Sequence, residues 1–221
     1  MDARFVIQQR QHVTHAPEQS ASPAILSRLG LQSIQDFFLY AVLSGSAYQV
    51  RTGTITTPIV GDVVITDAAA EYCVDATSGY TIVPVVNTIS IRLGTGTLHE
   101  YAVKSVNAVS SAGTAFVPLP LRNVGPDGAT AVAAATTARA ATAGGVTVTA
   151  ELATTTRRHW SFANPVAVGA GNEAGPVAWE PRMPPILVGP VCLYVQIAAT
   201  TTGPSYYAHL DYIEMVTSLL V

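Results

Sequence analysis

Apolar and polar residues alternate along several stretches of this chain. In one of them Tyr101 and Val103 fall on one face of a strand, while Glu100 and Lys104 fall on the other. The same period of two recurs in residues 115–122, 146–152, 191–197 and 205–211. This period places alternate side chains on the two sides of a β-sheet, so these stretches are predicted strands.

Runs of β-branched residues predict further strands over residues 52–57, 63–66 and 80–93. Pro84 within the last run predicts a sheet edge or a β-bulge, because proline cannot donate to the strand ladder. The Ala/Thr-rich segment 129–143 is interpreted as strand and loop. Gly and Pro turns separate the runs too closely for intervening helices. The predicted fold is therefore all-β, a single jelly-roll-like antiparallel β-sandwich.

One short helix precedes the strands. Ser22-Pro23 is typical of a helix start, apolar residues up to Val42 follow helical spacing, and Gly45 is a plausible end. Residues 37–43 would fit a buried strand equally well. Residues 1–21 are predicted to be an N-terminal arm, and residues 22–221 form the sandwich domain, with a long Pro/Gly-rich loop at 163–185.

The chain carries unusually little charge. Only 11% of its residues are Asp, Glu, Lys or Arg while 49% are apolar, and about a quarter is charged in ordinary domains. A surface without mixed charge is typical of a subunit that hides it against neighbours. Lys104, the lone lysine, lies on the same strand face as Glu100, so we expect solvent to reach that face.

The charge balance also bears on partners and location. The net charge is −3, and the largest basic cluster is Arg157-Arg158, so no specific nucleic-acid binding is predicted. No apolar stretch is long enough to span a membrane. The N-terminus does not resemble a signal peptide.

One face of the C-terminal strand carries Ser205, Tyr207, His209 and Asp211. A Ser, a His and an Asp together are the residue types of a hydrolase. Residues two apart on a strand lie about 7 Å apart, however, which is too far for direct hydrogen bonds between these side chains. We therefore predict no catalytic residue and no enzyme, and a hydrolase that uses His209 is the least favoured alternative.

No metal or cofactor is predicted. His12 and His15 lie in the arm, and His209 and Asp211 with His159 or His99 lack a recognised ligand spacing. Cys73 and Cys192 lie on apolar runs and are interpreted as buried thiols rather than a disulfide. The glycines of the 163–185 loop do not match a phosphate-binding motif.

Aromatic side chains flank this Pro/Gly-rich loop. Trp160, Phe162 and Trp179 are interpreted as anchors that hold the loop to the core. The alternative is a receptor- or glycan-binding domain of a phage fibre or spike, with Trp160, Trp179 and Tyr206-Tyr207 as its platform.

Two segments resemble virion structural proteins of bacteriophages. They are TITTPIVGDVVITDAAAEYCVDATSGYTIVPVVNTISI, residues 54–91, and LYVQIAATTTGPSYYAHLDYIEMV, residues 193–216. The two segments make up 62 of the 221 residues, and the resemblance implies a jelly roll or related sandwich that builds or decorates a capsid.

Together these features predict a capsid protein that self-assembles, as a shell subunit or as a decoration subunit. Its expected partners are copies of itself, as a trimer or higher oligomer, and other capsid proteins. Its expected location is the virion, after synthesis in the host cytoplasm.

Overall fold

The computed structural model describes residues 37–93, 98–122, 134–140, 145–164, 174–200 and 203–219. Contacts divide the chain into two compact units, Met1–Tyr40 and Ala41–Val221. The second unit is an antiparallel β-sandwich, which confirms the predicted all-β class. The predicted arm and the predicted helix start at Ser22 lie outside the described residues.

The helix ends where the sequence predicts. Helix α1 spans Phe37–Ser44, so the helical interpretation holds over the alternative strand. Gly45 follows with a φ of 81°, a left-handed conformation that glycine adopts without steric cost. The N–H groups of Gly45 and Ser46 donate to the carbonyls of Val42 at 3.1 Å and Ala41 at 2.8 Å. This is the hydrogen-bond pattern of a Schellman motif, which satisfies the last carbonyls of a helix.

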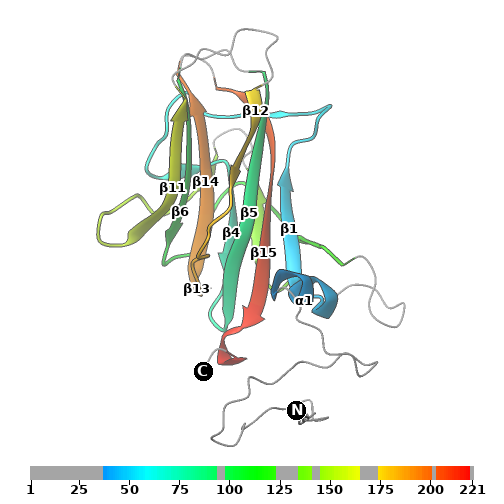
Figure 1. Ribbon diagram of the computed structural model, residues 1–221. Coiled ribbons are helices and arrows are strands. Elements are labelled where there is room, and N and C mark those ends of the chain that lie inside the picture. Colours follow the sequence, from blue (N-terminus) through cyan, green and yellow to red (C-terminus); the bar gives the residue numbers. More distant parts are fainter. Residues whose placement is uncertain are drawn as a thin grey trace, which may run out of the picture. The chain divides into compact units, whose positions relative to one another are not determined.

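Two sheets form the layers of the sandwich (Figure 1). The first has the strand order β12-β5-β15-β1-β8, with β13 beside β5 and β2 beside β15. Its strands are β1 Ala47–Thr52, β2 Ile59–Val60, β5 Tyr80–Leu93, β8 Leu119–Pro120, β12 Ala174–Trp179, β13 Leu187–Val188 and β15 Ser205–Val216. A short 3-10 helix, Thr217–Leu219, follows β15.

The second sheet has the order β11-β6-β14-β4-β9-β7. Its strands are β4 Tyr72–Ala76, β6 His99–Val106, β7 Thr114–Phe116, β9 Thr137–Ala140, β11 Thr156–Asn164 and β14 Val191–Ala199. A separate two-stranded sheet pairs β3, Ala69–Ala70, with β10, Val146–Thr147.

The eight described strands of five or more residues pair in a nested order. The first pairs with the eighth (β1–β15) and the second with the seventh (β4–β14). The third pairs with the sixth (β5–β12) and the fourth with the fifth (β6–β11). The β5–β15 and β6–β14 pairings join these four antiparallel pairs into the two sheets. The chain is thus wound as a long hairpin folded over on itself.

Several predicted strands are confirmed. The run 80–93 is β5, and the alternating stretches at 101–104, 191–197 and 205–211 fall within β6, β14 and β15. On the side of β5 away from β15, strand β13 pairs with Thr81 and Ile82 and strand β12 pairs from Asn87 onward, so Pro84 lies between these two partners. Tyr212 pairs with Pro84 and Asp211 with Val86, which leaves Val85 as the extra residue of a bulge.

Two predicted strands are wrong. Residues 53–57 form a turn, because Gly53 takes a φ of 64° and Thr57 N–H donates to the Thr54 hydroxyl at 2.9 Å. The observed strand, β1, ends at Thr52 instead of beginning there. The run 63–66 is not a strand either, and Val63 and Val64 are 54% and 55% exposed. β-Branched side chains favour strands only where a partner strand can accept them.

Other predictions hold in part. The stretch 115–122 splits into β7 and β8, which belong to different sheets. Only Val146–Thr147 of the stretch 146–152 is a strand. In the predicted loop 163–185, residues 174–179 form β12, and residues 165–173 lie outside the described residues. Residues 137–140 of the segment 129–143 form β9.

The main core lies between the two sheets and the second core lies on the outer face of the second sheet. All nine residues of β14 are buried, because this strand has a core on each side. The second core consists of Ala70, Cys73, Val106, Val146, Val148, Cys192 and Tyr194. Strands β3 and β10 supply Ala70 and Val146, so this small sheet covers the outer face of β4, β6 and β14.

Candidate functional site

The polar face of β15 lies on the outer side of the first sheet. Ser205, Tyr207, His209 and Asp211 are half-buried and alternate with buried residues, as the sequence predicts. Asp211 Oδ1 accepts a hydrogen bond from Gln49 Nε2 at 2.8 Å. Burial raises the pKa of the Asp211 carboxyl, and the Gln49 hydrogen bond and the charge of His209 act against that rise. This carboxylate is thus fixed by the neighbouring strand β1.

The four residues of the alternative glycan platform do not form one exposed surface, because Trp179 and Tyr206 are buried. Trp179 is 6% exposed and stacks on His159, with 6.2 Å between ring centroids. Tyr206 points into the core while Tyr207 lies on the outer face. Trp160 stacks on Phe162 at 6.1 Å. Burial of Trp179 matches the anchoring role, since a buried indole fixes the start of the segment that follows β12.

The described histidines are held in separate places. The ring of His99 is buried, and its Nδ1 lies 3.2 Å from the Tyr101 hydroxyl. His159 Nε2 lies 2.8 Å from the Ser105 hydroxyl, and burial, followed by the nearby charge of Arg157, lowers the pKa of this imidazole. His209 lies on the other sheet. His12 and His15 lie outside the described residues.

Lys104 is buried, so the prediction that solvent reaches it is wrong. Its side chain is 2% exposed, and Nζ pairs with Glu151 Oε2. Arg158 Nη2 donates to the other oxygen, Oε1, at 2.9 Å. The Lys104 hydrogen bond is the main reason why the pKa of Glu151 is lowered. Residues 145–151 fold over the outer face of β6 and bring Glu151 above Lys104, which sequence alternation alone does not reveal.

The carboxyl of Glu71 is buried just after the loop 53–68. Glu71 is 4% exposed; its Oε1 accepts from the Asp62 N–H at 3.0 Å and its Oε2 from the Tyr206 hydroxyl at 3.2 Å. Burial and the charge of Asp62 raise the pKa of Glu71 to about 7, although both hydrogen bonds lower it. Burial also raises the pKa of Asp62. Glu71 therefore changes its charge near neutral pH.

A cluster of two cysteines and one aspartate lies in the second core. Cys73, Asp75 and Cys192 place their ligand atoms within 4.8 Å of one another, and all three residues are buried. Among the described residues no other group of three or more His, Cys, Asp or Glu side chains comes together in this way. Ser110 donates to Asp75 through its N–H at 2.8 Å and its hydroxyl at 2.6 Å. Both cysteines are free thiols, as predicted.

Strand register explains how this cluster forms. Cys73 and Asp75 are two residues apart on β4 and therefore share a face. Cys192 pairs directly with Asp75 across the β4–β14 ladder. The sequence signal is the Cys-x-Asp spacing, but the partner strand lies more than a hundred residues away and must be known first.

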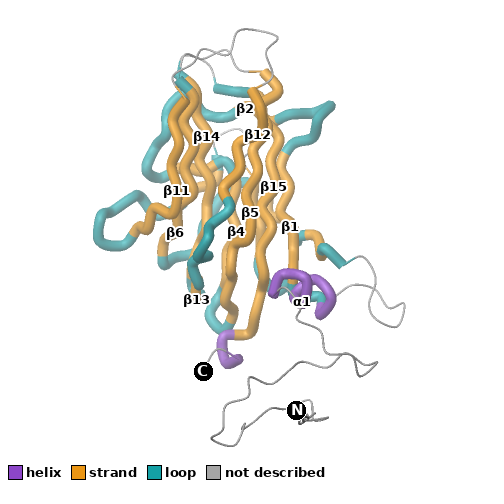
Figure 2. Tube along the Cα trace, in the orientation of Figure 1, coloured by secondary structure: helices purple, strands orange, loops and turns teal. Residues whose placement is uncertain are grey.

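The loop between β1 and β4 exposes several apolar side chains. Ile55, Val60, Val63 and Val64 are each more than half exposed, at 63%, 62%, 54% and 55%. We call these four residues the apolar loop patch. Figure 2 shows β2, within this loop, at the end of the sandwich remote from β13.

The backbone of this loop is firmly held. The N–H of Gly61 donates to Pro204 O at 2.8 Å and that of Asp62 to Ile197 O at 3.0 Å. The N–H of Ala199 donates to Asp62 O at 2.9 Å. These hydrogen bonds hold the backbone of Gly61 and Asp62, which lie between Val60 and Val63 of the apolar loop patch.

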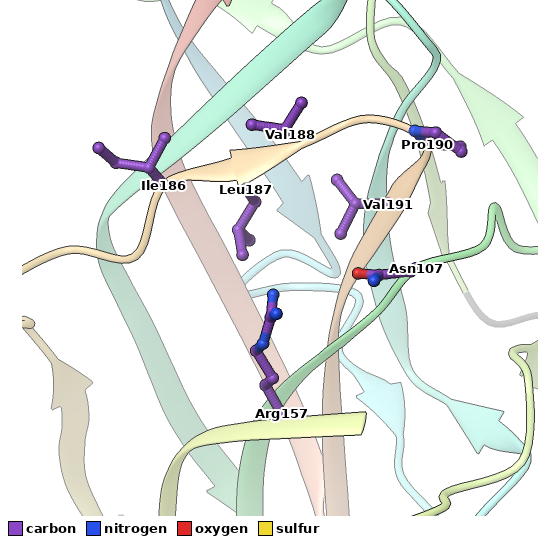
Figure 3. Close-up of a pocket in the computed structure, with 7 residues that line it drawn as sticks. All are labelled: Asn107, Arg157, Ile186, Leu187, Val188, Pro190 and Val191. Carbon is purple, nitrogen blue, oxygen red and sulfur yellow. The ribbon is translucent and has the colours of Figure 1, made fainter. Parts of the chain in front are cut away.

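A pocket of about 290 Å³ lies beside β13 (Figure 3). The guanidinium of Arg157 extends from β11 toward Leu187. Ile186 and Val188 on the rim are 62% and 49% exposed. The pocket is lined by Asn107, Arg157, Ile186, Leu187, Val188, Pro190 and Val191. Arg157 and Asn107 are the polar residues of this lining, and the other five residues are apolar.

Within the described residues, no helix has the length and apolar character needed to cross a bilayer. No protein-family model, curated protein or solved structure matches this chain.

Proposed function

We propose that this chain is a structural subunit of a bacteriophage virion that acts by self-assembly, either as a shell subunit or as a shell-decorating subunit. It works by burying apolar and uncharged surface against copies of itself and against other capsid proteins. In this proposal it catalyses no reaction.

The strand order supports this proposal. We infer that the sandwich is a jelly roll, because the nested pairing of its eight longer strands joins the two halves of the chain strand by strand. Jelly rolls build many viral capsid and lectin domains. A fold does not by itself determine a function, so the proposal rests mainly on the surface.

The apolar loop patch is the observation that carries the proposal. Four exposed aliphatic side chains lie within ten residues on a hydrogen-bonded frame. Only 11% of the chain is charged. Mixed surface charge normally keeps protein molecules from associating, and this chain has little of it. Patches of this kind mark interaction sites. Closed rings of three or more subunits would bury the patch in each copy.

Polar substitution of the apolar loop patch tests this role. In Val63→Thr/Val64→Thr, both side chains keep their shape and gain a hydroxyl. We expect the free energy of unfolding to change by less than about 0.5 kcal/mol, because both residues are exposed. The concentration needed for assembly should rise roughly thirtyfold, since two buried hydroxyls at about 1 kcal/mol each would together cost about 2 kcal/mol. Light scattering against concentration measures this threshold.

The matched control is Val109→Thr/Val117→Thr, which makes the same change at two valines that are 49% and 60% exposed elsewhere. We expect this control to assemble like the wild type. Wild-type assembly of the Val63→Thr/Val64→Thr variant would show that the loop does not form the contact.

Deletion of residues 1–21 tests the predicted arm. The expected product is a folded domain with an intact sandwich, because every described strand of the two sheets lies after residue 46. Its assembly should be poor, because the arm is proposed to reach a neighbouring subunit. Circular dichroism measures the fold and electron microscopy measures the particles. Normal particles from the truncated chain would refute the role of the arm.

A further inference from the structure

We propose that Cys73, Asp75 and Cys192 bind a single zinc ion in the second core. Two thiolates and a carboxylate are ligands that Zn²⁺ takes in proteins. The site goes beyond the proposed function, and its presence does not depend on assembly.

The arrangement of the ligands is set by the sheet. Two come from one strand at positions i and i+2, and the third lies directly opposite on the neighbouring strand. All three ligand atoms already lie within 4.8 Å of one another. Ligands about 2.0–2.3 Å from one tetrahedral ion lie somewhat closer together than this. Rotamer adjustments of the side chains therefore suffice, and the backbone of β4 and β14 keeps its register.

Ser110 lies where a fourth ligand of the proposed zinc ion would be. Its hydroxyl lies 3.2 Å from Cys73 Sγ and 2.6 Å from Asp75 Oδ2, so it faces the space among the ligand atoms. This hydroxyl would complete four-fold coordination, and a tetrahedral ion with four ligands is the usual geometry of protein-bound zinc.

The surroundings fit a charged centre. Binding releases the two thiol protons, so two thiolates, one carboxylate and Zn²⁺ leave a net charge of −1. Arg139 Nε lies 3.5 Å from Asp75 Oδ2, and its guanidinium offsets that charge. The N–H of Ser110 donates to Asp75 Oδ1 at 2.8 Å, and a hydrogen-bond donor behind a ligand is typical of metal sites. Arg139 also donates to Ala112 O through Nη1 at 3.3 Å, which fixes the guanidinium over the cluster.

The site is enclosed. Cys73 and Cys192 are fully buried, and Ala70, Val106, Val146 and Val148 pack in the same core. An ion held there is shielded from competing water, and it enters while the chain folds rather than by diffusion into the folded protein. The test must therefore load the metal during synthesis.

The experiment measures metal in the full chain expressed in zinc-supplemented minimal medium and purified without chelator. We expect one zinc ion per chain by elemental mass spectrometry. The same chain expressed with Co²⁺ should show a thiolate-to-cobalt charge-transfer band and the visible bands of tetrahedral Co²⁺. Cys192→Ser and Asp75→Asn should lose both signals. Arg139→Gln should retain the ligands and bind about tenfold more weakly.

The control is His209→Ala, which removes an imidazole from the outer face of the other sheet and should retain full zinc. The wild-type measurements stand even where a variant fails to fold. Wild-type protein without stoichiometric zinc and without the charge-transfer band overturns the proposal. An intact mass lower by two hydrogens, which indicates a Cys73–Cys192 disulfide, overturns it as well.

Discussion

Glu151→Ala is expected to lower the free energy of unfolding by about 3–5 kcal/mol. The substitution leaves Lys104, a 2% exposed lysine, without its carboxylate partner. A buried charge that loses its carboxylate partner keeps its desolvation cost and loses the compensating attraction. Urea denaturation of the variant and of the wild type at neutral pH measures the difference.

Lys104→Met separates this explanation from a simple loss of contacts. Methionine fills a similar volume without charge, and Glu151 keeps its hydrogen bond from Arg158. We expect a loss of only about 1 kcal/mol, because replacing one partner by an apolar side chain removes the desolvation cost. The double variant should be about as stable as Lys104→Met alone. Strictly additive losses in the double variant would contradict the pairing.

Glu71→Gln should make the protein less sensitive to pH. Glutamine retains an oxygen that accepts from the Asp62 N–H, and it carries no charge. The pKa of Glu71 rises from its ordinary value of 4.5 to about 7 in the folded chain. Between these values the folded state holds a proton that the unfolded state has lost. Raising the pH through this window therefore removes about 3 kcal/mol of stability.

The variant lacks this loss. Its stability relative to the wild type should increase by about 3 kcal/mol from pH 4.5 to pH 8. Other carboxylates have the opposite effect on the pH dependence of stability. The pKa of Glu151 is lowered, so the stability that it contributes to the folded protein is lost as the pH falls. These contributions are the same in the wild type and in Glu71→Gln, so they cancel when the two free energies of unfolding are subtracted. Parallel pH profiles for wild type and Glu71→Gln would show that Glu71 titrates at its ordinary value.

The sequence predicts strands best where both neighbours are long strands. Residues 80–93 and 205–216 pair with each other over twelve register positions, so intrinsic preference and partner agree. It predicts them poorly at 52–57 and 63–66, where most of the β-branched residues lie in a loop. Between these runs the N–H of Gly61 donates to Pro204, just before β15, and the N–H of Asp62 donates to Ile197 in β14, which fixes the loop backbone. Strand β1 is not predicted by the sequence pattern, because its alternating residues are few and directly follow the helix.

The candidate sites are less visible in the sequence than the strands. The common face of Ser205, Tyr207, His209 and Asp211 follows from the period of two alone. Lys104 and Glu151 are 47 residues apart, and Glu71 meets Tyr206 from 135 residues away. Their burial depends on which segments cover which faces. The cluster of Cys73, Asp75 and Cys192 needs the β4–β14 register as well, so only the folded chain shows it.

Sedimentation velocity of the purified full chain tests self-assembly most directly. Over a series of concentrations at neutral pH, we expect closed oligomers of three or more copies, or larger particles, in place of the 23.0 kDa chain. The amount of assembled material should grow with concentration and fall in Val63→Thr/Val64→Thr. A single species at the mass of one chain across the whole series would contradict the proposal that this protein is a self-assembling subunit.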